Sequence, residues 1–275
     1  MEIPPAGDTG ILNRLNSAMN FPATSILTNI QFQEYPGEEE ILFEKKYILI
    51  RTLENRLITD EDLVKLPEIA GNHGHYGEWM MRKSSTQRLI RRLSAPGKPL
   101  EILEVGCGNG WLAHRLSEIP GSKVTGLDIN FTELHQAARV FRNIPNLRWI
   151  QGDIRSGILG DRRYDRIVFA ASVQYFPFLK EILYTALANL SPDGEIHILD
   201  TPFYKTGELE KARDRSLAYY TSFGYPEMAD FYFHHTFEDL LFFRPAFLYD
   251  PRSIRNRLRR IKSPFPWVRI KHIKL

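Results

Sequence analysis

Short apolar runs alternate with longer amphipathic stretches through the central part of the chain, from residue 98 to residue 201. This rhythm is typical of strands and helices that alternate in a parallel α/β sheet. The run from 166 to 170 is nearly all apolar, as expected of a strand that is covered on both faces. We expect strands at 100–105, 123–128, 147–152, 166–170 and 195–199, with helices at 111–118, 132–143 and 178–190.

The residues before this block, 1–95, have mainly helical patterns. Asp60-Glu61-Asp62 is an acidic group that is well placed to begin a helix. A further helix is expected over 84–93, where it leads into the first strand of the block. The glycine-containing stretch 71–77 predicts a flexible joint between these helical segments.

The residues after the block break its rhythm between 202 and 244, where we expect a helix near 208–222 and an aromatic-rich stretch. Two apolar runs, 245–249 and 267–271, are expected to close the sheet as a final pair of strands. Ser191-Pro192-Asp193-Gly194 is a turn signal that ends the preceding helix.

Taken together, these patterns predict a doubly wound, mostly parallel α/β sheet with a helical N-terminal cap and an aromatic-rich insertion after the fifth strand. We expect two parts, the cap over 1–95 and a main domain over 96–275. The insertion at about 202–244 belongs to the main domain and is expected to act as a lid. No internal repeat and no low-complexity stretch interrupts this organisation.

The composition is that of an ordinary soluble globular protein, because 43% of the residues are apolar, 12% aromatic and 25% charged. These values exclude a disordered chain. The single cysteine, Cys107, excludes an intrachain disulfide and a cysteine-cluster metal site, and no metal is expected. No stretch reaches the ~18 apolar residues of a membrane span. The N-terminus lacks the pattern of a signal peptide, so we expect a cytoplasmic protein.

Positive charge is concentrated at the end of the chain. The net charge is +3, from 36 basic and 33 acidic residues, and nine of the basic residues follow the last acidic residue, Asp250. Without those nine, 27 basic residues remain against 33 acidic ones, so residues 1–250 carry a net charge of −6. Such a segment suits phosphates or anionic lipid surfaces, or it is a solvated hairpin at the end of the sheet. The nine residues are Arg252, Arg255, Arg257, Arg259, Arg260, Lys262, Arg269, Lys271 and Lys274.

A glycine-rich segment, Glu104-Val105-Gly106-Cys107-Gly108-Asn109-Gly110-Trp111, lies between a predicted strand and a predicted helix. Glycines let the backbone turn sharply and approach a ligand closely, and the N–H groups of the helix start face that ligand. Asp128 ends the second predicted strand, where a carboxylate in a doubly wound fold faces the ribose of a nucleoside. The G-x-G-x-x-G/A pattern of dinucleotide-binding proteins fails, because Trp111 stands where a small residue is required. The sequence also has no P-loop motif.

The glycine-rich segment resembles motif I of the class I S-adenosylmethionine-dependent methyltransferases, and the resemblance extends over about residues 76–250. It implies a Rossmann-like fold, S-adenosylmethionine as cofactor and methyl transfer as the activity. It also implies that the loop holds the methionine part of the cofactor and that acids after successive strands contact its amino group, ribose and adenine. The cofactor residues so implied are Gly106, Gly108 and Gly110 for the methionine part, Glu104 for the amino group, Asp128 and Ile129 for the ribose and adenine, Asp153 and Ile154 for the adenine, and Ala170 at the end of the fourth-strand motif.

Several residues of this region have two interpretations. Asp153 and Asp165 are either functional acids or turn-forming residues. Trp79 and Arg82 are candidates for a lid, and Arg82 either pairs with the carboxylate of the cofactor or is a surface charge of its helix. Cys107 is interpreted as a small residue that fills the loop, because nothing nearby in the sequence offers a base to activate it.

The acceptor is expected at the carboxyl ends of the strands, where ligands of open α/β sheets bind. This places Ser172, Gln174, Tyr175, Asp200 and Tyr204 near the methyl group. Gln174 and Tyr175 follow the fourth strand and are predicted to orient the acceptor, with Tyr204 as a further contact. Tyr175 is also a candidate catalytic residue.

The aromatic side chains between 219 and 235 form either part of the core or a lid over the sheet. As a lid they favour an apolar or aromatic acceptor. His234 is the second candidate catalytic residue, and either it or His235 is the candidate base for a hydroxyl acceptor; the pair is not expected to bind a metal. A base is not essential to the prediction, because positioning supplies ~7–11 kcal/mol and a general base only ~3–5 kcal/mol.

The predicted function is S-adenosylmethionine-dependent methyl transfer to a small-molecule acceptor. A nucleic-acid methyltransferase that uses the basic C-terminal segment is an alternative, although residues 170–175 lack the [DNS]-P-P-[YF] sequence of enzymes that methylate exocyclic base amines, and no RNA-binding module is visible. A non-catalytic nucleoside-binding module and a nicotinamide dehydrogenase are further alternatives. The sequence leaves open the identity of the acceptor, the atom that is methylated and the oligomeric state.

Overall fold

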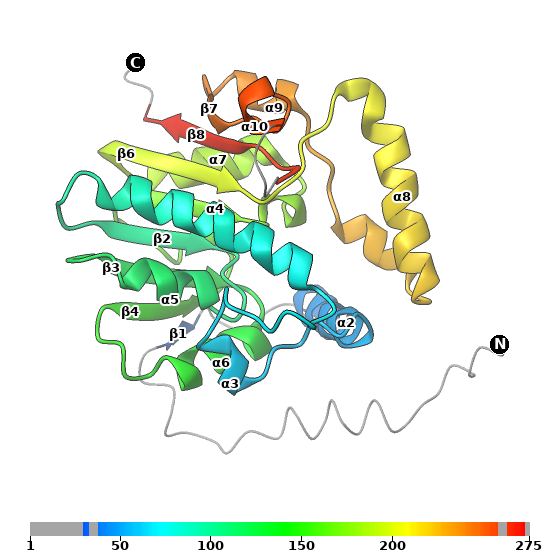
Figure 1. The fold of residues 1–275 in the computed structure, drawn as a ribbon, viewed down its shortest axis with the longest axis horizontal. Coiled ribbons are helices and arrows are strands. Elements are labelled where there is room, and N and C mark those ends of the chain that lie inside the picture. The colour runs from blue at the N-terminus through cyan, green and yellow to red at the C-terminus, as the bar shows by residue number, and fades with distance from the viewer. Residues whose placement is uncertain (1–29, 33–37, 258–262, 273–275) are drawn as a thin grey trace.

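The structure is a computed structural model that describes residues 30–32, 38–257 and 263–272. Its centre is a sheet of eight strands in the order β1-β4-β3-β2-β5-β6-β8-β7 (Figure 1). Neighbouring strands from β1 to β6 in this order run parallel, and β8 is antiparallel to both β6 and β7. The strands are β1 Ile30–Phe32, β2 Glu101–Val105, β3 Lys123–Asp128, β4 Leu147–Gln151, β5 Tyr164–Ala170, β6 Leu190–Leu199, β7 Ala246–Tyr249 and β8 Trp267–Lys271.

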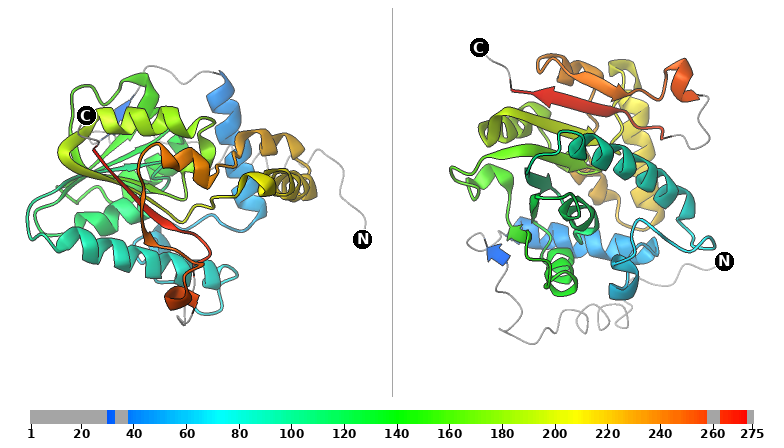
Figure 2. Two further views of the ribbon diagram at one scale, coloured as in Figure 1. Left: turned by 90° about the horizontal axis from the view of Figure 1, so that it is seen from above. Right: turned by 60° about the vertical axis from the view of Figure 1, so that its left-hand side comes forward.

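Helices cover both faces of the sheet (Figure 2). Alternate residues of β2 pack into two cores, Ile102 with α4, α5 and α6, and Leu103 and Val105 with α7 and α9. Among the helices of the described residues, none combines the length and the apolar character that a membrane crossing requires. The helices are α2 Glu38–Leu53, α3 Asp60–Leu63, α4 Tyr76–Ser94, α5 Trp111–Ser117, α6 Phe131–Val140, α7 Leu179–Ala188, α8 Leu209–Ser222, α9 Phe237–Leu241 and α10 Ile254–Arg257.

Helices α2 and α8 lie beyond the carboxyl ends of the parallel strands, at the right in Figure 1. Ile50 of α2 packs with Tyr220 of α8 and with Met228 of the 3-10 turn η4 (Pro226–Phe231). Lys46 of α2 also forms an ion pair of 2.7 Å with Glu227 of η4. Segments that precede and follow the sheet in sequence therefore meet over the same end of it.

The fold class and the strands predicted from the pattern are confirmed, including the final antiparallel pair. The prediction of a flexible joint over 71–77 is wrong at its end, because α4 already begins at Tyr76. An i,i+4 ion pair of 2.9 Å between Glu78 and Arg82 and a hydrogen bond from the Trp79 N–H to the His75 carbonyl stabilise this first turn. The edge strand β1 was not predicted, since its few residues are too short for a periodic pattern.

The predicted turn at 191–194 remains inside a strand. Tyr164 of β5 pairs with Leu190, but Arg166 pairs with Glu195, so the register between β5 and β6 shifts across the intervening residues. Such an irregularity accommodates extra residues in one strand without ending the pairing. The turn signal therefore marks a bulge at the start of β6, and the regular part of the strand begins where the prediction placed it.

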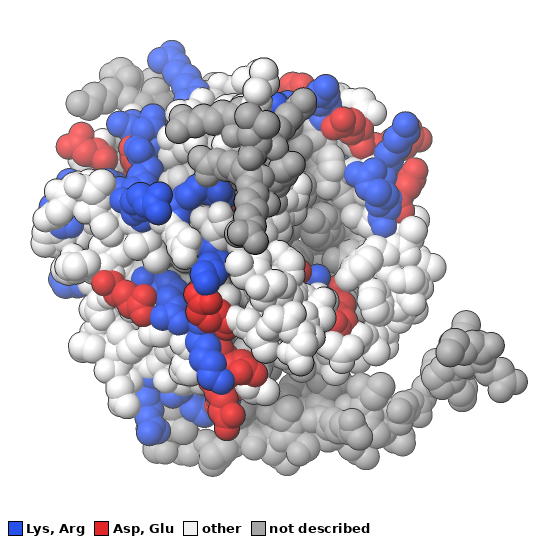
Figure 3. Space-filling model, viewed as in Figure 1, with Lys and Arg blue, Asp and Glu red and all other residues white. Residues whose placement is uncertain are grey.

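Basic side chains gather where β6, β8 and α4 meet at the amino end of β6 (Figure 3). Arg269 and Lys271 of β8 lie 3.4 and 3.6 Å from the carboxylate of Glu195, which Arg92 and Arg166 also approach at 3.3 and 4.0 Å. This part of the C-terminal basic segment is thus a hairpin at the end of the sheet. Arg259, Arg260, Lys262 and Lys274 lie outside the described residues.

The close approach of β3 and β4 gives a test of the core. Gly126 faces Trp149 on the neighbouring strand, and a Cβ at Gly126 would lie 2.5 Å from the indole and 2.9 Å from Cys107 Sγ. We predict that Gly126→Ala lowers the free energy of unfolding by about 1–3 kcal/mol, because a fully buried core has no room for the methyl group. Urea denaturation measures this loss.

Two variants control for other causes of the loss. Gly207→Ala, where no atom lies within 4 Å of the added Cβ, should change stability by less than about 0.5 kcal/mol. The double variant Gly126→Ala, Trp149→Leu should lose less than the sum of the two single changes. A stability of Gly126→Ala equal to that of the unaltered protein would contradict the packing described.

Candidate functional site

The loop between β2 and α5 folds back onto the end of β3. The N–H groups of Gly106 and Cys107 donate to the Leu127 carbonyl at 2.8 and 3.1 Å. The N–H of Gly108 donates to Asp128 Oδ2 at 2.6 Å. Three successive N–H groups therefore fix the loop at the carboxyl end of β3, where ligands of open α/β sheets bind.

Close packing around this loop requires glycine. Gly106 has a φ of +71°, and a Cβ there would lie 2.5 Å from the Cβ of Ser172. At Gly108, where φ is +51°, a Cβ would lie 3.0 Å from a Glu133 carboxylate oxygen. A Cβ at Gly110 would instead lie 2.2 Å from the Trp149 indole. Gly106 and Gly108 thus line the site, whereas Gly110, also predicted to hold the cofactor, packs against the core.

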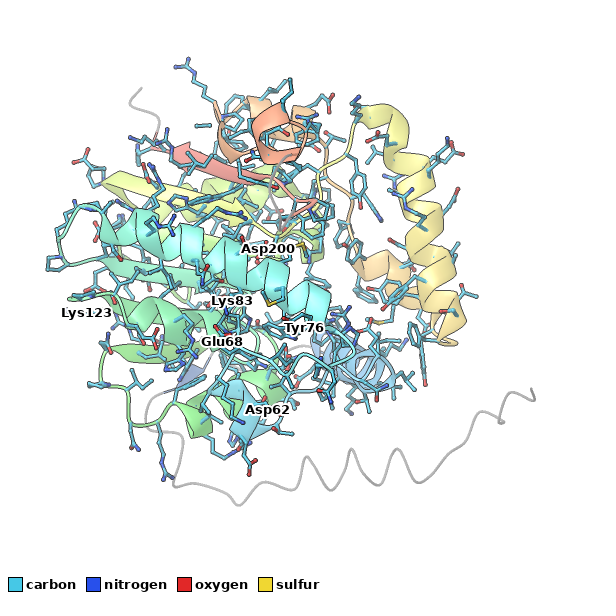
Figure 4. All side chains as sticks on the ribbon, viewed as in Figure 1. Asp62, Glu68, Tyr76, Lys83, Lys123 and Asp200 are labelled. Carbon is cyan, nitrogen blue, oxygen red and sulfur yellow. The ribbon has the colours of Figure 1, made fainter. Side chains whose placement is uncertain are left out.

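Two cavities meet at the loop. The larger, of about 440 Å³, extends from Asp128 to aromatic side chains of α2 and of the insertion. The smaller, of about 110 Å³, lies between the loop and the start of α4. Figure 4 labels Tyr76 at this start of α4, and Lys123 at the opposite end of the sheet, where β3 begins. The residues that line both cavities are Tyr47, Gly106, Gly108, Glu133 and Ala171.

Asp128 and Ile129 line the larger cavity at the end of β3. Besides its bond from Gly108, Asp128 accepts a hydrogen bond from the Asn130 N–H at 2.8 Å. Burial raises the pKa of the Asp128 carboxyl to about 6, although these N–H groups oppose the rise. The carboxylate therefore both holds the loop and faces the cavity.

Asp153 and Ile154 line the same cavity, after β4. Asp153 caps the 3-10 turn η1 (Ile154–Ser156) by accepting the Arg155 N–H at 2.7 Å, and it forms an ion pair of 2.6 Å with the same arginine. Asp153 thus has the turn-forming role and also lines the cavity, and its contact with the adenine stays a prediction. Asp165 lies within β5 and accepts the N–H of Glu101 at 2.9 Å, so it links the amino ends of β5 and β2 and does not form a turn.

Glu104 presents a buried carboxylate to the smaller cavity. Burial raises the pKa of this carboxyl well above its ordinary value, although a backbone hydrogen bond from Ala113 opposes the rise. Within the described part of the chain, its Oε2 atom has no hydrogen-bond partner. A buried acceptor of this kind fits a ligand that brings a positively charged donor, such as an ammonium group.

Arg82 and Ala170 also line the smaller cavity. The Arg82 guanidinium pairs with Glu78 of its own helix at 2.9 Å and lies over the Trp79 ring, 5.4 Å from its centroid. Trp79 meets Trp111 edge to face, with ring centroids 5.3 Å apart. Arg82 is therefore paired on its helix and also lines the cavity, and its pairing with the carboxylate of the cofactor stays a prediction.

Glu133 of α6 lines both cavities and was not predicted. Burial raises the pKa of its carboxyl to about 7, and the negative charge of Asp128 adds to the rise, whereas Arg51 opposes it. Sequence patterns do not distinguish this residue, because it occupies the third position of a helix that Asn130 caps. The Asn130 side chain accepts the Glu133 N–H at 2.9 Å. An acid at this position is ordinary in the first turn of a helix. Tyr47 of α2, which lines both cavities as well, was also missed.

The predicted acceptor contacts divide into two groups. Ser172 and Tyr175 line the larger cavity, whereas Gln174 and Tyr204 line neither cavity. The buried Gln174 amide donates to the Ala171 carbonyl at 2.6 Å and accepts from the Thr201 hydroxyl at 3.1 Å. Gln174 thus stabilises the turn after β5. Both polar atoms of its buried amide have hydrogen-bond partners within the protein.

His234 lies outside both cavities, behind an aromatic side chain of the insertion. Its ring is 5.3 Å from that of Tyr232, which in turn lies 6.0 Å from the ring of Tyr175. Its Nε2 lies 2.9 Å from the Ser216 hydroxyl, and burial lowers the pKa of the imidazole. Asp200 also lies outside both cavities. It faces α4, where its carboxylate accepts a hydrogen bond from the Ser85 hydroxyl at 2.7 Å (Figure 4).

Comparisons with known proteins agree with this geometry. Residues 102–194 match a family described as a methyltransferase domain. A malonyl-[acyl-carrier protein] O-methyltransferase of Halalkalibacterium halodurans is 31% identical over 131 residues, which are 44% of this chain and 48% of that protein. A sterol 24-C-methyltransferase of Gibberella zeae is 26% identical over 122 residues, which are 42% of this chain and 32% of that protein.

Solved structures share the fold. Magnesium protoporphyrin IX methyltransferase from Synechocystis, with bound S-adenosylmethionine, superimposes with a TM-score of 0.53 at 12% identity, over 88% of this chain and 100% of that one. The same enzyme with S-adenosylhomocysteine gives a TM-score of 0.52 at 15% identity, over 75% and 90% of the two chains.

These matches confirm the family resemblance noted in the sequence. The chain has a Rossmann-like fold, and its residues 102–194 match a methyltransferase domain. They support S-adenosylmethionine as the cofactor. The chain spans about half the length of the malonyl-[acyl-carrier protein] O-methyltransferase that it matches.

The buried carboxylates predict how cofactor binding depends on pH. S-adenosylmethionine carries a sulfonium and an ammonium group, so in this site it would bind best when Glu133 and Asp128 are ionised. Their pKa values of about 7 and about 6 mean that both take up protons as the pH falls below neutral. We expect the affinity to be full at pH 8 and to drop about tenfold or more by pH 5.5.

Calorimetric titrations at several pH values measure this dependence. Glu133→Gln should flatten it, whereas the surface variant Glu118→Gln should leave it unchanged. S-adenosylhomocysteine, which lacks the sulfonium charge, should show a weaker dependence. An affinity that stays constant between pH 8 and pH 5.5 would refute the electrostatic role given to these carboxylates.

Proposed function

We propose that the protein is an S-adenosylmethionine-dependent methyltransferase that acts on a small-molecule acceptor with an apolar or aromatic part. The observation that carries the proposal is the junction of the two cavities at the glycine loop. Acidic side chains surround the loop side of this junction, and aromatic side chains of α2 and the insertion surround the other side. A cationic donor and an apolar acceptor would therefore meet at one point.

The cofactor residues follow from this arrangement. Glu104 would accept a hydrogen bond from the amino group, and Arg82 would pair with the carboxylate, because both residues line the smaller cavity. Asp128 and Ile129 would hold the ribose, and Asp153 with Ile154 the adenine, in the larger cavity. Gly106 and Gly108 allow the backbone to lie against the ligand without side chains between them.

When bound, S-adenosylmethionine supplies a methyl group on a positively charged sulfur. The residues of this chain would act mainly by orientation and by exclusion of water, contributions that reach ~7–11 kcal/mol in well-aligned reactions. Tyr175 is the proposed contact of the acceptor, because it lines the larger cavity and packs against Tyr47 at 5.9 Å between ring centroids. Proton transfer directly to His234 is not part of the proposal, since that ring lies behind Tyr232.

Segments outside residues 102–194 would form the acceptor wall. Phe43 and Tyr47 come from α2, within the proposed N-terminal cap (1–95), and Phe231 comes from the proposed lid (202–244). Phe43 packs against Phe231 at 5.2 Å between ring centroids. An aromatic wall of this kind suits the apolar parts of small acceptors. Two relatives named above act, by their names, on a malonyl-carrier conjugate and on a sterol.

The basic C-terminal segment offers less support for a nucleic-acid substrate. Arg269 and Lys271 lie beside Glu195 at the amino end of β6, whereas the cavities lie at the carboxyl ends of the strands. These described basic residues therefore lie at the opposite end of the sheet from the cavities and line neither of them.

Binding of S-adenosylhomocysteine to Asp128 variants tests the proposal. Isothermal titration calorimetry should give one site per chain, and Asp128→Asn should weaken binding about tenfold or more. The amide would present N–H groups to the backbone N–H of Gly108 or Asn130, which now donate to the carboxylate at 2.6 and 2.8 Å. Asp161→Asn, which removes an exposed carboxylate, should bind as tightly as the unaltered protein. Absence of binding to the folded, unaltered protein would rule out the proposed function.

A further inference from the structure

Arg51 of α2 places a guanidinium at the junction of the cavities, and the function proposed above assigns it no role. It lines the smaller cavity together with Tyr47, which lines both. Its guanidinium lies over the Tyr47 ring, 4.9 Å from the centroid. Its side chain is only 23% exposed. A cation in this position is costly unless it has a function or strong partners.

Tyrosine side chains lie next to this guanidinium. The Tyr47 ring lies under it, and Tyr175 packs edge to face against Tyr47, with ring centroids 5.9 Å apart. Burial raises the pKa of Tyr47, Tyr220 and Tyr232, and Arg51 opposes the rise in each case. These hydroxyls therefore stay protonated and can donate hydrogen bonds. Of these tyrosines, Tyr47 lines the smaller cavity together with Arg51, so an oxygen anion there would meet a guanidinium beside a phenolic donor.

Arg51 is also one end of a chain of alternating charges. Its Nη1 lies 3.2 Å from Glu54, and Glu54 lies 3.2 Å from Arg56. Arg56 in turn lies 2.5 Å from Glu78, which pairs with Arg82 at 2.9 Å. Each carboxylate is shared by two guanidinium groups, so the two end groups, Arg51 and Arg82, are only partly neutralised. Both arginines line the smaller cavity, and Arg51 lies over Tyr47, a residue of the aromatic wall.

The local charge limits the kind of anion that fits. Glu54 contacts Arg51, and Glu133 faces it from α6 with a pKa raised to about 7 by burial. A dianionic phosphate would be repelled by these carboxyl groups more strongly than a monoanion. The planar fork of a guanidinium matches the two oxygens of a carboxylate. The apolar walls beside it suit a hydrocarbon or aromatic body.

We propose that Arg51, assisted by the hydroxyl of Tyr47, recognises a carboxylate on the acceptor, so that the substrate class is a small apolar or aromatic carboxylic acid. The inference rests on the proposed function, because it places this acid beside the cofactor site. It adds a specificity-determining residue that lies outside the methyltransferase domain of residues 102–194. Recognition of the carboxylate, rather than of the apolar body alone, is the claim to be tested.

Calorimetry on the full chain saturated with S-adenosylhomocysteine tests the claim. The probes are 2-naphthoate and decanoate, each compared with its uncharged amide. We expect at least one acid to bind about tenfold or more tightly than its amide. Arg51→Gln should remove this preference without weakening the amide more than about twofold, and Arg51→Lys should restore only part of it. Tyr47→Phe should weaken the acid by about threefold.

A matched control lies on the same helix. Lys46→Gln removes one positive charge of α2 and an ion pair with the exposed Glu227, yet Lys46 lines neither cavity. This variant should keep the preference for the acid. Binding of S-adenosylhomocysteine by every variant reports folding and the cofactor site separately. If the unaltered protein does not bind it, the proposed function fails.

Other outcomes bear on the inference alone. If S-adenosylhomocysteine binds but acids and amides bind equally, or neither acid binds at millimolar concentration, carboxylate recognition is wrong. Tighter binding of 2-naphthyl phosphate than of 2-naphthoate would likewise overturn it, because the site would then prefer a dianion. A preference for the acid that survives Arg51→Gln would show that another group reads the carboxylate.

Discussion

The hydrogen bonds between the glycine loop and the end of β3 are the constraint on which the rest of the site depends. Leu127 offers its carbonyl to two loop N–H groups, and the Asp128 carboxylate takes the next, from Gly108. These bonds hold the loop where Gly106 and Gly108 line both cavities, which Glu133 of α6 also lines. A single side chain, Asp128, thereby links the geometry of the loop to the electrostatics of the site.

The site combines residues from the segment that matches a methyltransferase domain with residues from segments outside it. The acids that surround the loop belong to the strands and helices of residues 102–194, which match a methyltransferase domain. The aromatic wall and Arg51 come from α2 and from the insertion, which meet only in the folded molecule through contacts such as Lys46 with Glu227. The proposed cofactor half of the site thus lies within the matched segment, whereas the proposed acceptor half also draws on residues outside it.

This difference also decides what the sequence can predict. Strands that alternate with helices, and acids that directly follow strands, have local patterns, so the sheet and the residues Glu104, Asp128 and Asp153 could be placed in advance. Glu133 and Tyr47 carry no such pattern, because one resembles a helix-capping acid and the other an ordinary aromatic of an amphipathic helix. Gln174 was misassigned for the same reason, since only the folded turn shows its amide to be bound to Ala171 and Thr201. The position of a residue after a strand can be read from the local sequence. Whether its side chain points into a cavity depends on the folded structure.

The edge-to-face contact of Trp79 and Trp111 has a practical consequence. Both indoles border the smaller cavity, one at the start of α4 and one directly after the glycine loop. A molecule that enters this space must displace solvent from their rings and alter the polarity around them. The protein therefore carries an intrinsic fluorescent reporter of occupancy, which follows ligand entry in real time without any added label.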